Sequence, residues 1–553
     1  MPKNKTKSKS KKQAGAGKST LNLKEQLAQK RKAAKARKEL ISFSTGAVFG
    51  AAFLGMMAFP LGGPKAAIGA IAGIICLAFS FKYPRQALWA FLIYMPFSGT
   101  IIYTLGNSPV LQLAKDGFYI PGLISIIQEC RQKRLPIVIP KGLKPSLILL
   151  FVCCLITLLF VNGSQQMNAE QVAILTRQPP EKPLALGILG LKVFMGYIPL
   201  ITCAYYLIRT KKEFFFMTRL HVILALICFG LCFVQYMFLK TGRCAGTQFA
   251  EGGDLFKASI EARCLVGGSL LYSPEQGVIR LPGTFVAPWQ WGWFIISNAY
   301  FTFATAFSDP SGLWRTFGLV AMAADFAIAV ISGQRIALAL VPASFVILLI
   351  LTGQIANLKR FLPIATGLAV LLGIAAVLYP EIVQERIDSF VGRWEESPAD
   401  EFILYQFGFT WNNLKGSLIG LGLGRATNSA RVFGNTALVE TWFPKVMHEV
   451  GPIGLAAFLI FVSCLTFYTF KAYRSIRDPS LRSFAACFWV FVLFISYQTY
   501  YYPLDVDPVA VYYWFFAGVI LKLPEIARQE DESEEKVEQK NTKRGKKAKL
   551  SWV

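Results

Sequence analysis

Runs of about 20 apolar residues recur along most of this 553-residue chain, and they constrain its fold more than any other feature. Each run is long enough to cross the roughly 30 Å hydrocarbon core of a bilayer as a helix. The composition agrees, because 54% of the residues are hydrophobic, 16% are charged and the mean hydropathy is +0.45. Such values exclude a chain that is disordered over most of its length. The sequence therefore predicts an all-α polytopic membrane protein.

We expect about 12–14 transmembrane helices and a large extracytoplasmic loop. Two of the apolar runs are weaker than the rest, because 109–129 carries Lys115 and Asp116, and 86–104 contains a proline. The fourteen predicted spans are 41–60, 66–82, 86–104, 109–129, 145–162, 185–207, 214–239, 284–306, 314–332, 335–352, 361–379, 446–470, 482–501 and 508–523.

The distribution of charge predicts the orientation of these spans. The net charge is +26, and the basic residues gather in the tails and in alternate short connections. Because short cytoplasmic loops carry an excess of Lys and Arg, we expect both termini to be cytoplasmic. The basic connections are 82–85, 131–144, 209–213, 357–360 and 471–482. We therefore interpret the basic residues as setting the topology of the chain in the membrane. We expect membrane lipid as a partner, and no nucleic acid. No cleavable signal-peptide pattern is visible in the first 40 residues.

Ionisable residues inside spans are costly and are often functional. Lys115 and Asp116 are either a neutralised pair or the mark of a span end. Arg219 lies near the inner end of a span, so we expect it to snorkel toward water. We expect His221 to be a packing residue, and Asp325 to be a hydrogen-bond partner between helices rather than a site carboxylate.

Two cysteines, Cys244 and Cys264, lie in the outside connection 241–283. On an oxidising side of the membrane we expect them to form a disulfide, which would stabilise the fold by about 3 kcal/mol. The alternative is two free thiols. The two histidines, His221 and His448, are far apart in the sequence, and the pattern predicts no metal site and no cofactor.

Arginines at the outer ends of spans are the most informative charges. Arg280 precedes one span in GVIRLPGTFVAPWQWGW, and Arg335 lies in an outer hairpin in VISGQRIALALV. A guanidinium matches phosphate oxygens in a bidentate fashion, so two such arginines beside a carboxylate could hold a diphosphate. The alternative is that they only anchor the chain at the interface.

Three stretches, in this order and topology, resemble the bacterial O-antigen ligase and O-antigen polymerase family. They are R-x-x-G-T-F-x-x-P (Arg280 to Pro288), S-G-Q-R-x-A-L-x-L (Ser332 to Leu340) and I-G-L-G-L-G (Ile419 to Gly424). The outside loop 380–445 then leads into a span that opens with E-x-G-x-x-G, from Glu449 to Gly454. The resemblance covers roughly residues 275–460.

This resemblance implies a membrane glycosyltransferase. Such an enzyme transfers glycan from a polyprenyl-diphosphate carrier to an acceptor hydroxyl on a glycan or lipid, outside the bacterial cytoplasmic membrane. It gives Arg280 and Arg335 the role of binding the diphosphate. The catalytic histidine of the family's ligases falls on Glu440 here, and His448 is eight residues further on. Glu440 is therefore the candidate base, and the departure favours a polymerase or a divergent member over a strict ligase.

Secondary candidates for contacts with phosphate or acceptor are Arg386, Arg393, Arg425 and His448; the alternative for these arginines is a solvated loop. Two other functions stay open, namely a multi-pass transporter of a small anion or sugar, and a non-catalytic member that binds assembly partners through its charged tails. The expected parts of the chain are a disordered basic tail (1–40), N-terminal spans (41–270), an O-antigen ligase-like core (271–470), C-terminal spans (471–523) and a disordered charged tail (524–553).

Overall fold

A computed structural model describes residues 23–106, 114–177, 179–250, 255, 259–274, 278–354 and 398–550, together with scattered residues between 359 and 395. The chain separates into two compact units, Met1–Phe79 and Ser80–Val553. Among the described residues of the first unit, α1 (Leu23–Met56) and the start of α2 (Phe59–Lys82) form a helical hairpin. The two helices of this hairpin meet closely at Gly55, where an added Cβ would lie 2.2 Å from the Ile71 side chain.

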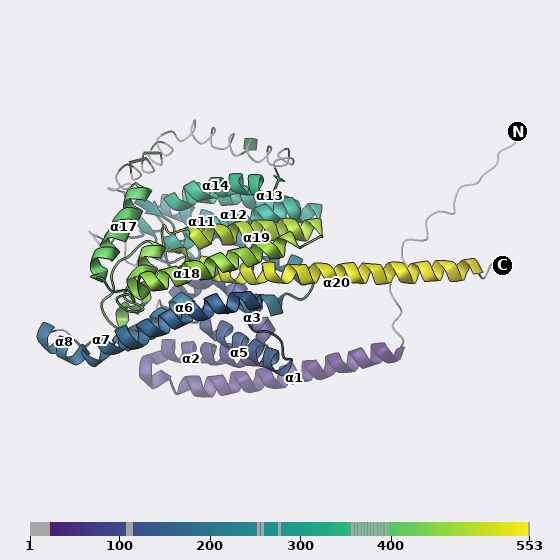
Figure 1. The fold of residues 1–553 in the computed structure, drawn as a ribbon, viewed down its shortest axis with the longest axis horizontal. Helices are drawn as coiled ribbons and strands as arrows, with labels where there is room; N and C mark the ends of the chain where they lie inside the picture. The colour runs from purple at the N-terminus through teal and green to yellow at the C-terminus, as the bar shows by residue number, and fades with distance from the viewer. Residues whose placement is uncertain are drawn as a thin grey trace. The chain divides into compact units, whose positions relative to one another are not determined.

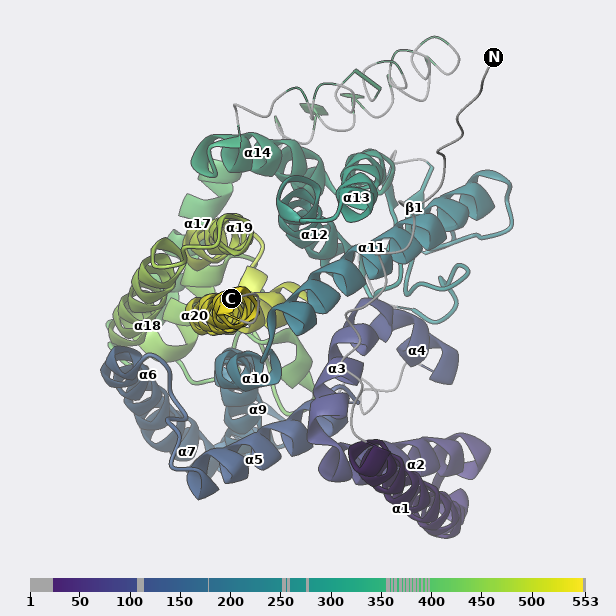
Figure 2. The ribbon, with the colours of Figure 1, turned by 90° about the vertical axis from the view of Figure 1, so that its right-hand side faces the viewer.

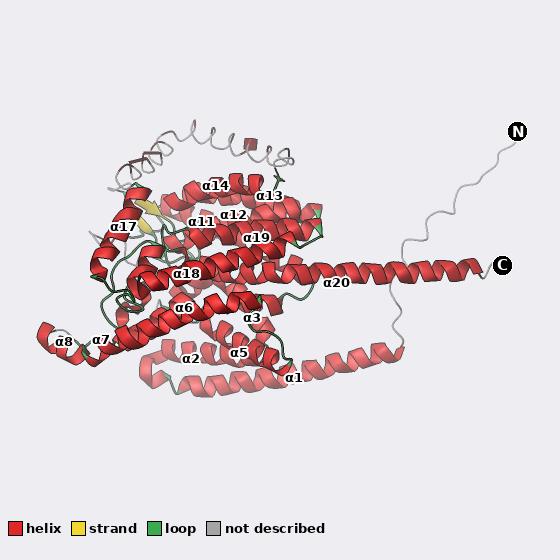
Figure 3. Cartoon of the chain, viewed as in Figure 1, coloured by secondary structure: helices red, strands yellow, loops and turns green. Residues whose placement is uncertain are grey.

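The second unit is almost entirely helical, as the apolar periodicity predicts (Figure 1). Its described α-helices are α3 (Pro84–Tyr94), α4 (Ser98–Leu105), α5 (Asp116–Gln132), α6 (Lys144–Ile156), α7 (Gly163–Met167), α8 (Ala169–Thr176), α9 (Pro183–Met195), α10 (Leu200–Leu207), α11 (Lys211–Lys240), α12 (Pro288–Ser308), α13 (Gly312–Ile331), α14 (Arg335–Leu351), α17 (Ala399–Leu414), α18 (Trp442–Arg474), α19 (Pro479–Tyr497) and α20 (Val509–Leu550). Two short antiparallel strands, β1 (Leu271–Ser273) and β2 (Val278–Arg280), pair at the end of the helices that is drawn on the left in Figure 3.

The protein is a multi-pass membrane protein. In the part of the chain that the structure describes, eight helices are long and apolar enough to cross a membrane, or nine if the bent pair α9 and α10 counts as one span. The helix expected over 109–129 begins only at Asp116. Helix α14 covers nearly all of the span predicted over 335–352, and its 17 residues make it one of the shorter apolar helices. The predicted span 361–379 falls largely outside the described residues.

The first half of α20 is the centre of the second unit. Its apolar residues from Val509 to Leu523 are almost all buried. Figure 2 looks along this helix and shows α10, α12, α18 and α19 around it. Helix α12 is similarly enclosed, and its tryptophans Trp291 and Trp293 are fully buried. A helix that is apolar on every side is typical of the interior of a membrane bundle.

Within the tail predicted to be disordered (524–553), α20 continues as a helix to Leu550. This segment is rich in Glu, Lys, Gln and Arg, which are good helix formers. Side chains one turn apart also bond there, because Gln529 donates to Glu525 and the Lys522 ammonium lies 2.8 Å from a Glu525 oxygen. Local pairs of this kind favour continuation of the helix into the charged tail.

The connections that the charge pattern places on one side do contact one another. Arg85 lies 3.0 Å from Glu213, and Lys211 lies 2.5 Å from Asp478, so the connections 82–85, 209–213 and 471–482 meet. Ser480 donates to the Ser308 carbonyl at 2.6 Å, which adds the turn after α12 to the same group. Sorting of the basic loops into one cluster is the behaviour that the positive-inside rule requires.

Three of the ionisable residues singled out within spans behave differently from one another. Arg219 reaches the connection after α12, where its guanidinium donates two hydrogen bonds of 2.9 Å to the buried Asp309 carboxylate. His221 packs as expected, with its ring against Phe301 and its Nδ1 near the Met217 carbonyl. The expectation for Asp325 is wrong: neither of its buried carboxylate oxygens has a hydrogen-bond partner among the described residues.

Candidate functional site

Arg280 and Arg335 lie on two backbone segments that touch. Arg280 is the last residue of β2, and the next residue, Leu281, donates its N–H to the Ser332 carbonyl at 2.9 Å. Gly333 adopts φ +69°, and an added Cβ there would lie 1.7 Å from the Ile279 carbonyl oxygen. A glycine is therefore required for this approach. The backbone segments that carry the two arginines, 55 positions apart in the sequence, are therefore adjacent.

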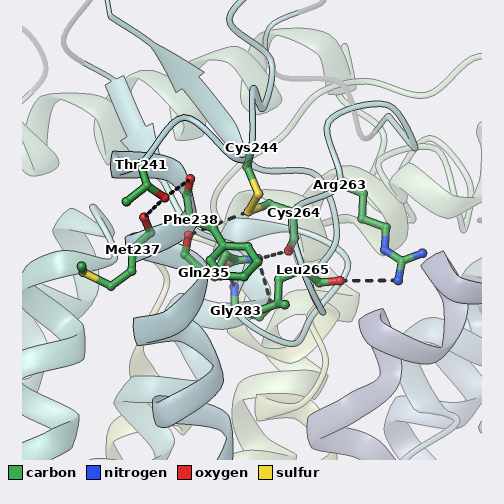
Figure 4. Close-up of a disulfide and its surroundings, with 9 residues drawn as sticks. All are labelled: Gln235, Met237, Phe238, Thr241, Cys244, Arg263, Cys264, Leu265 and Gly283. Atoms are coloured by element: carbon green, nitrogen blue, oxygen red, sulfur yellow. Dashed lines mark hydrogen bonds between the residues drawn. A yellow bond between two sulfur atoms is a disulfide. The ribbon is translucent and has the colours of Figure 1, made fainter.

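The segment that carries Arg280 is fastened to α11 and to the disulfide loop. Cys244 and Cys264 form a disulfide in this structure (Figure 4). The buried Gln235 of α11 donates to the Cys264 carbonyl at 2.8 Å and accepts from the Gly283 N–H at 3.1 Å. One side chain thus ties the disulfide loop to the stretch just after Arg280. The predicted disulfide is therefore part of the support for this arginine.

Glu440 reaches the same region from the start of α18. Its neighbour Thr441 forms an antiparallel bridge with Tyr500, and Trp442 donates its N–H to the Thr499 carbonyl at 2.6 Å. Burial raises the pKa of the Glu440 carboxyl, and the positive charge of Arg280 partly counteracts this rise. Glu440 is therefore close enough to Arg280 for the charge of the guanidinium to act on its carboxyl. A half-buried carboxyl with a raised pKa is a better proton acceptor than an exposed one.

Tyr500 relates Arg335, the third candidate residue, to Glu440. Burial raises the pKa of its hydroxyl, and the charges of both Arg335 and Glu440 act on it. The two residues that follow, Tyr501 and Tyr502, both have positive φ values, +58° and +33°. Bulky residues rarely adopt this left-handed conformation, which costs on the order of 1–3 kcal/mol at each position. Strained backbone of this kind is held where the surrounding structure fixes it, and here it borders the candidate site.

The secondary candidates divide into two kinds. Arg386 and Arg393 lie outside the described residues. Arg425 is committed to other side chains, since it donates to Glu181 at 2.7 Å and to Gln165 at 2.8 Å. Because Arg425 holds the segments around Gln165 and Glu181 against its own, these bonds favour a structural role over contact with a ligand.

His448 is buried in α18, with only 4% of its surface exposed. Its Nδ1 has no hydrogen-bond partner among the residues described. The next residue, Glu449, accepts the N–H groups of Gly424 and Ala426, each at 3.0 Å. The glycine segment 420–424 thus packs onto α18 by close backbone approach, in agreement with the tight packing that its repeated glycines favour.

Sequence reasoning missed a set of buried ion pairs beside the site. The Lys445 ammonium pairs with Asp505, and only 5% and 9% of the two side chains are exposed. A cavity with room for about one water molecule adjoins this pair, and Trp442 and Glu449 also line it. Lys445 also lies over the Tyr502 ring, 5.7 Å from its centroid, so this pair supports the strained turn next to Glu440.

A second, partly buried pair joins Lys115 to Asp507, and Asp116 pairs instead with Lys192 at 2.9 Å. Lys115 and Asp116 are therefore each neutralised, but by other segments rather than by one another. The signal that could have revealed these pairs is the acidic P-L-D-V-D turn, residues 503–507, between two predicted spans. Acidic residues in so short an outer turn need basic partners at the same depth in the membrane.

The chain was compared with protein-family models and with curated proteins, and neither comparison finds a match. A function can therefore be inferred only from the arrangement of these side chains and from the resemblance of the motifs that carry them.

Proposed function

We propose that the protein is a membrane glycosyltransferase that polymerises or ligates glycan carried on a polyprenyl diphosphate. The observation that supports this most is the convergence of Arg280, Arg335 and Glu440 from three distant segments. Two guanidinium groups can bind a diphosphate in bidentate fashion, while the carboxylate offers a proton acceptor beside them. Their motifs are also those in which the sequence resembles the O-antigen ligase and polymerase family.

The proposed reaction is a single displacement at the anomeric carbon of the carrier-linked sugar. The acceptor hydroxyl oxygen forms a new bond to this carbon while the bond to the diphosphate oxygen breaks. Glu440 takes the hydroxyl proton, and Arg280 and Arg335 stabilise the negative charge that develops on the departing diphosphate. Fixed positive groups aimed at developing charge are among the largest contributions to catalysis.

We further propose that this site faces outward from a bacterial cytoplasmic membrane, with both termini inside. The support is the charge pattern, because the basic connections 82–85, 209–213 and 471–482 contact one another and belong to the opposite ends of the helices from β2 and the start of α18. On this orientation the donor and the acceptor meet outside, and the disulfide between Cys244 and Cys264 lies in an oxidising compartment.

The direct test uses purified protein in phosphatidylethanolamine–phosphatidylglycerol vesicles with a polyprenyl-diphosphate-linked glycan and an acceptor glycan. Arg280→Ala, Arg335→Ala and Glu440→Gln should each lower the transfer rate about 100-fold or more, the scale for loss of one group that stabilises developing charge. Arg263→Ala is the matched control, because Arg263 belongs to the disulfide loop and bonds to backbone carbonyls at 3.4 Å. Equal rates for all four variants would reject the proposal.

One observation favours the transporter alternative. Helices α9 and α10 form a span that is bent by 40° at a short break, and broken helices are common in transporters. The same vesicles separate the two functions. A transporter would accumulate labelled sugar or anion inside without forming a new glycosidic bond, whereas the proposed enzyme would form the bond without net uptake.

A further inference from the structure

Helix α17 has its polarity reversed relative to a helix on the surface of a soluble protein. The residues that it buries against the rest of the chain include Gln406, at 6% exposure, and Thr410, at 0%. The residues that it exposes include Leu404, Tyr405 and Trp411, at 69%, 66% and 64%. A polar face turned inward and an aromatic face turned outward indicate that the outer surroundings of this helix are not water.

The helix also runs in an unusual direction. Figure 1 shows α17 crossing the direction of α18 and α19 at one end of these helices. Since α18 and α19 are both candidate spans, a helix that crosses them at their ends lies along the membrane surface rather than through it. This is the orientation of an interfacial amphipathic helix.

The exposed apolar face of α17 continues into the lipid-facing side of α18. Ile453, Ile460 and Phe467 are spaced seven residues apart on α18 and are 49%, 48% and 61% exposed. Leu418, just beyond the end of α17, is 60% exposed, and its carbonyl accepts the Ile453 N–H at 3.4 Å. The apolar surface of a span therefore extends to Leu418, four residues beyond the end of α17.

The ends of the exposed face are charged. Glu401 is exposed in the first turn, and Lys415 is exposed directly after the last. Between them lie the leucine, the tyrosine and the tryptophan. Aromatic residues with a polar atom are enriched at the level of lipid headgroups, and charged groups at either end can reach water or headgroups from there.

From these four observations we propose that α17 is a membrane-interface helix, with Leu404, Tyr405 and Trp411 inserted among lipid headgroups and upper acyl chains. The occupant of this face is the bilayer itself. This inference does not depend on the proposed transferase activity, because it rests only on burial, direction and composition.

The buried face of the same helix holds the candidate site. The Gln406 side-chain oxygen accepts the Glu440 N–H at 3.1 Å, and the Phe402 ring lies 5.9 Å from the Tyr500 ring. One helix therefore joins the lipid headgroup layer to Glu440. The consequence is that the site lies at the depth of headgroup phosphates, where a diphosphate on a lipid carrier would also lie.

The test places a photoreactive benzoylphenylalanine at one position at a time in the full chain. The protein is reconstituted in vesicles of phosphatidylethanolamine and phosphatidylglycerol at 3:1, with a trace of radiolabelled lipid. Positions 404, 405 and 411 should yield lipid adducts at least about fivefold above position 261, an exposed control position in the disulfide loop. Position 410 is a second control, and it should crosslink within the chain.

Two results would overturn the proposal. The first is lipid labelling at 404, 405 and 411 no higher than at 261, which would show an aqueous face. The second is a dominant adduct between these positions and protein, either this chain or a second copy, which would show that protein covers the face. Both are read from gel mobility and radiolabel, without any measurement of glycan transfer.

Discussion

The buried pair of Lys445 and Asp505 shows how single residues stabilise the site. Taking two charges out of water is costly, and the cost is recovered only while both partners are present. This pair holds the turn 503–505 against the first helical turn after Glu440. Its role is therefore to fix the position of Glu440 rather than to contact a substrate.

Removing either partner should destabilise the protein strongly. We expect Lys445→Met or Asp505→Asn to lower the free energy of unfolding by about 3–5 kcal/mol, because each leaves an unpaired buried charge. The double variant Lys445→Met/Asp505→Asn should cost much less than the sum of the two changes. Unfolding by detergent titration in mixed micelles measures this. Lys133→Met is the control, since Lys133 and Glu129 form an exposed pair worth less than about 1 kcal/mol. Additive losses would contradict the account.

Glu440 should give the stability a characteristic dependence on pH. Its pKa is raised in the folded protein by burial, so the folded state holds a proton that the unfolded state releases at lower pH. Between the unfolded and folded pKa values, stability therefore falls as the pH rises. Glu440→Gln lacks this proton, so its stability relative to wild type should increase with pH from about 4.5 upward and then level off. A difference that stays constant with pH would contradict the burial of this carboxyl.

At the scale of elements, the site depends on contacts between connections rather than on any one helix. Segment 278–285 is tied to the hairpin 332–335 and to Gln235, and the segment before α18 is tied to the one after α19. Because these connections come from different parts of the sequence, a small displacement of one of them separates the charges.

Gly333 offers the sharpest test of this arrangement. Alanine there would place a Cβ 1.7 Å from the Ile279 carbonyl oxygen and would also require a left-handed residue. We expect Gly333→Ala to push the hairpin away from β2, to lower stability by about 1–3 kcal/mol and to weaken donor binding. Gly292→Ala is the control, because its Cβ would make only an ordinary 3.5 Å contact with the Gln334 side chain. Similar donor affinity in the two variants would show that the hairpin contact is not needed.

The sequence predicts some of these elements and not others, for physical reasons. Arg280, Arg335 and Glu440 could be singled out because charges at span ends are costly and therefore informative. The helical tail of α20 could not be predicted from hydropathy, because propensity and local ion pairs decide where a helix stops. Lys445 also escaped notice, since its partner Asp505 is 60 positions away and only the tertiary fold brings them together.

For the whole molecule, the two sides of the membrane bundle have different chemistry. One side gathers basic loops that bind acidic partners, as in the pair of Lys211 and Asp478. The other carries Arg280, Arg335 and Glu440, with α17 along the membrane surface. This division is what a transferase requires if it receives a lipid carrier from one leaflet and releases its product to one side.

The measurement that tests the central claim most directly is the profile of lipid-linked and surface glycan in a bacterial strain that lacks this gene. The strain is complemented with wild type, Arg280→Ala, Arg335→Ala, Glu440→Gln or His448→Ala, at matched protein levels in the membrane. The account predicts that long-chain glycan disappears in the deletion strain, that wild type and His448→Ala restore it, and that the other three variants do not. An unchanged glycan profile in the deletion strain would contradict the proposed function.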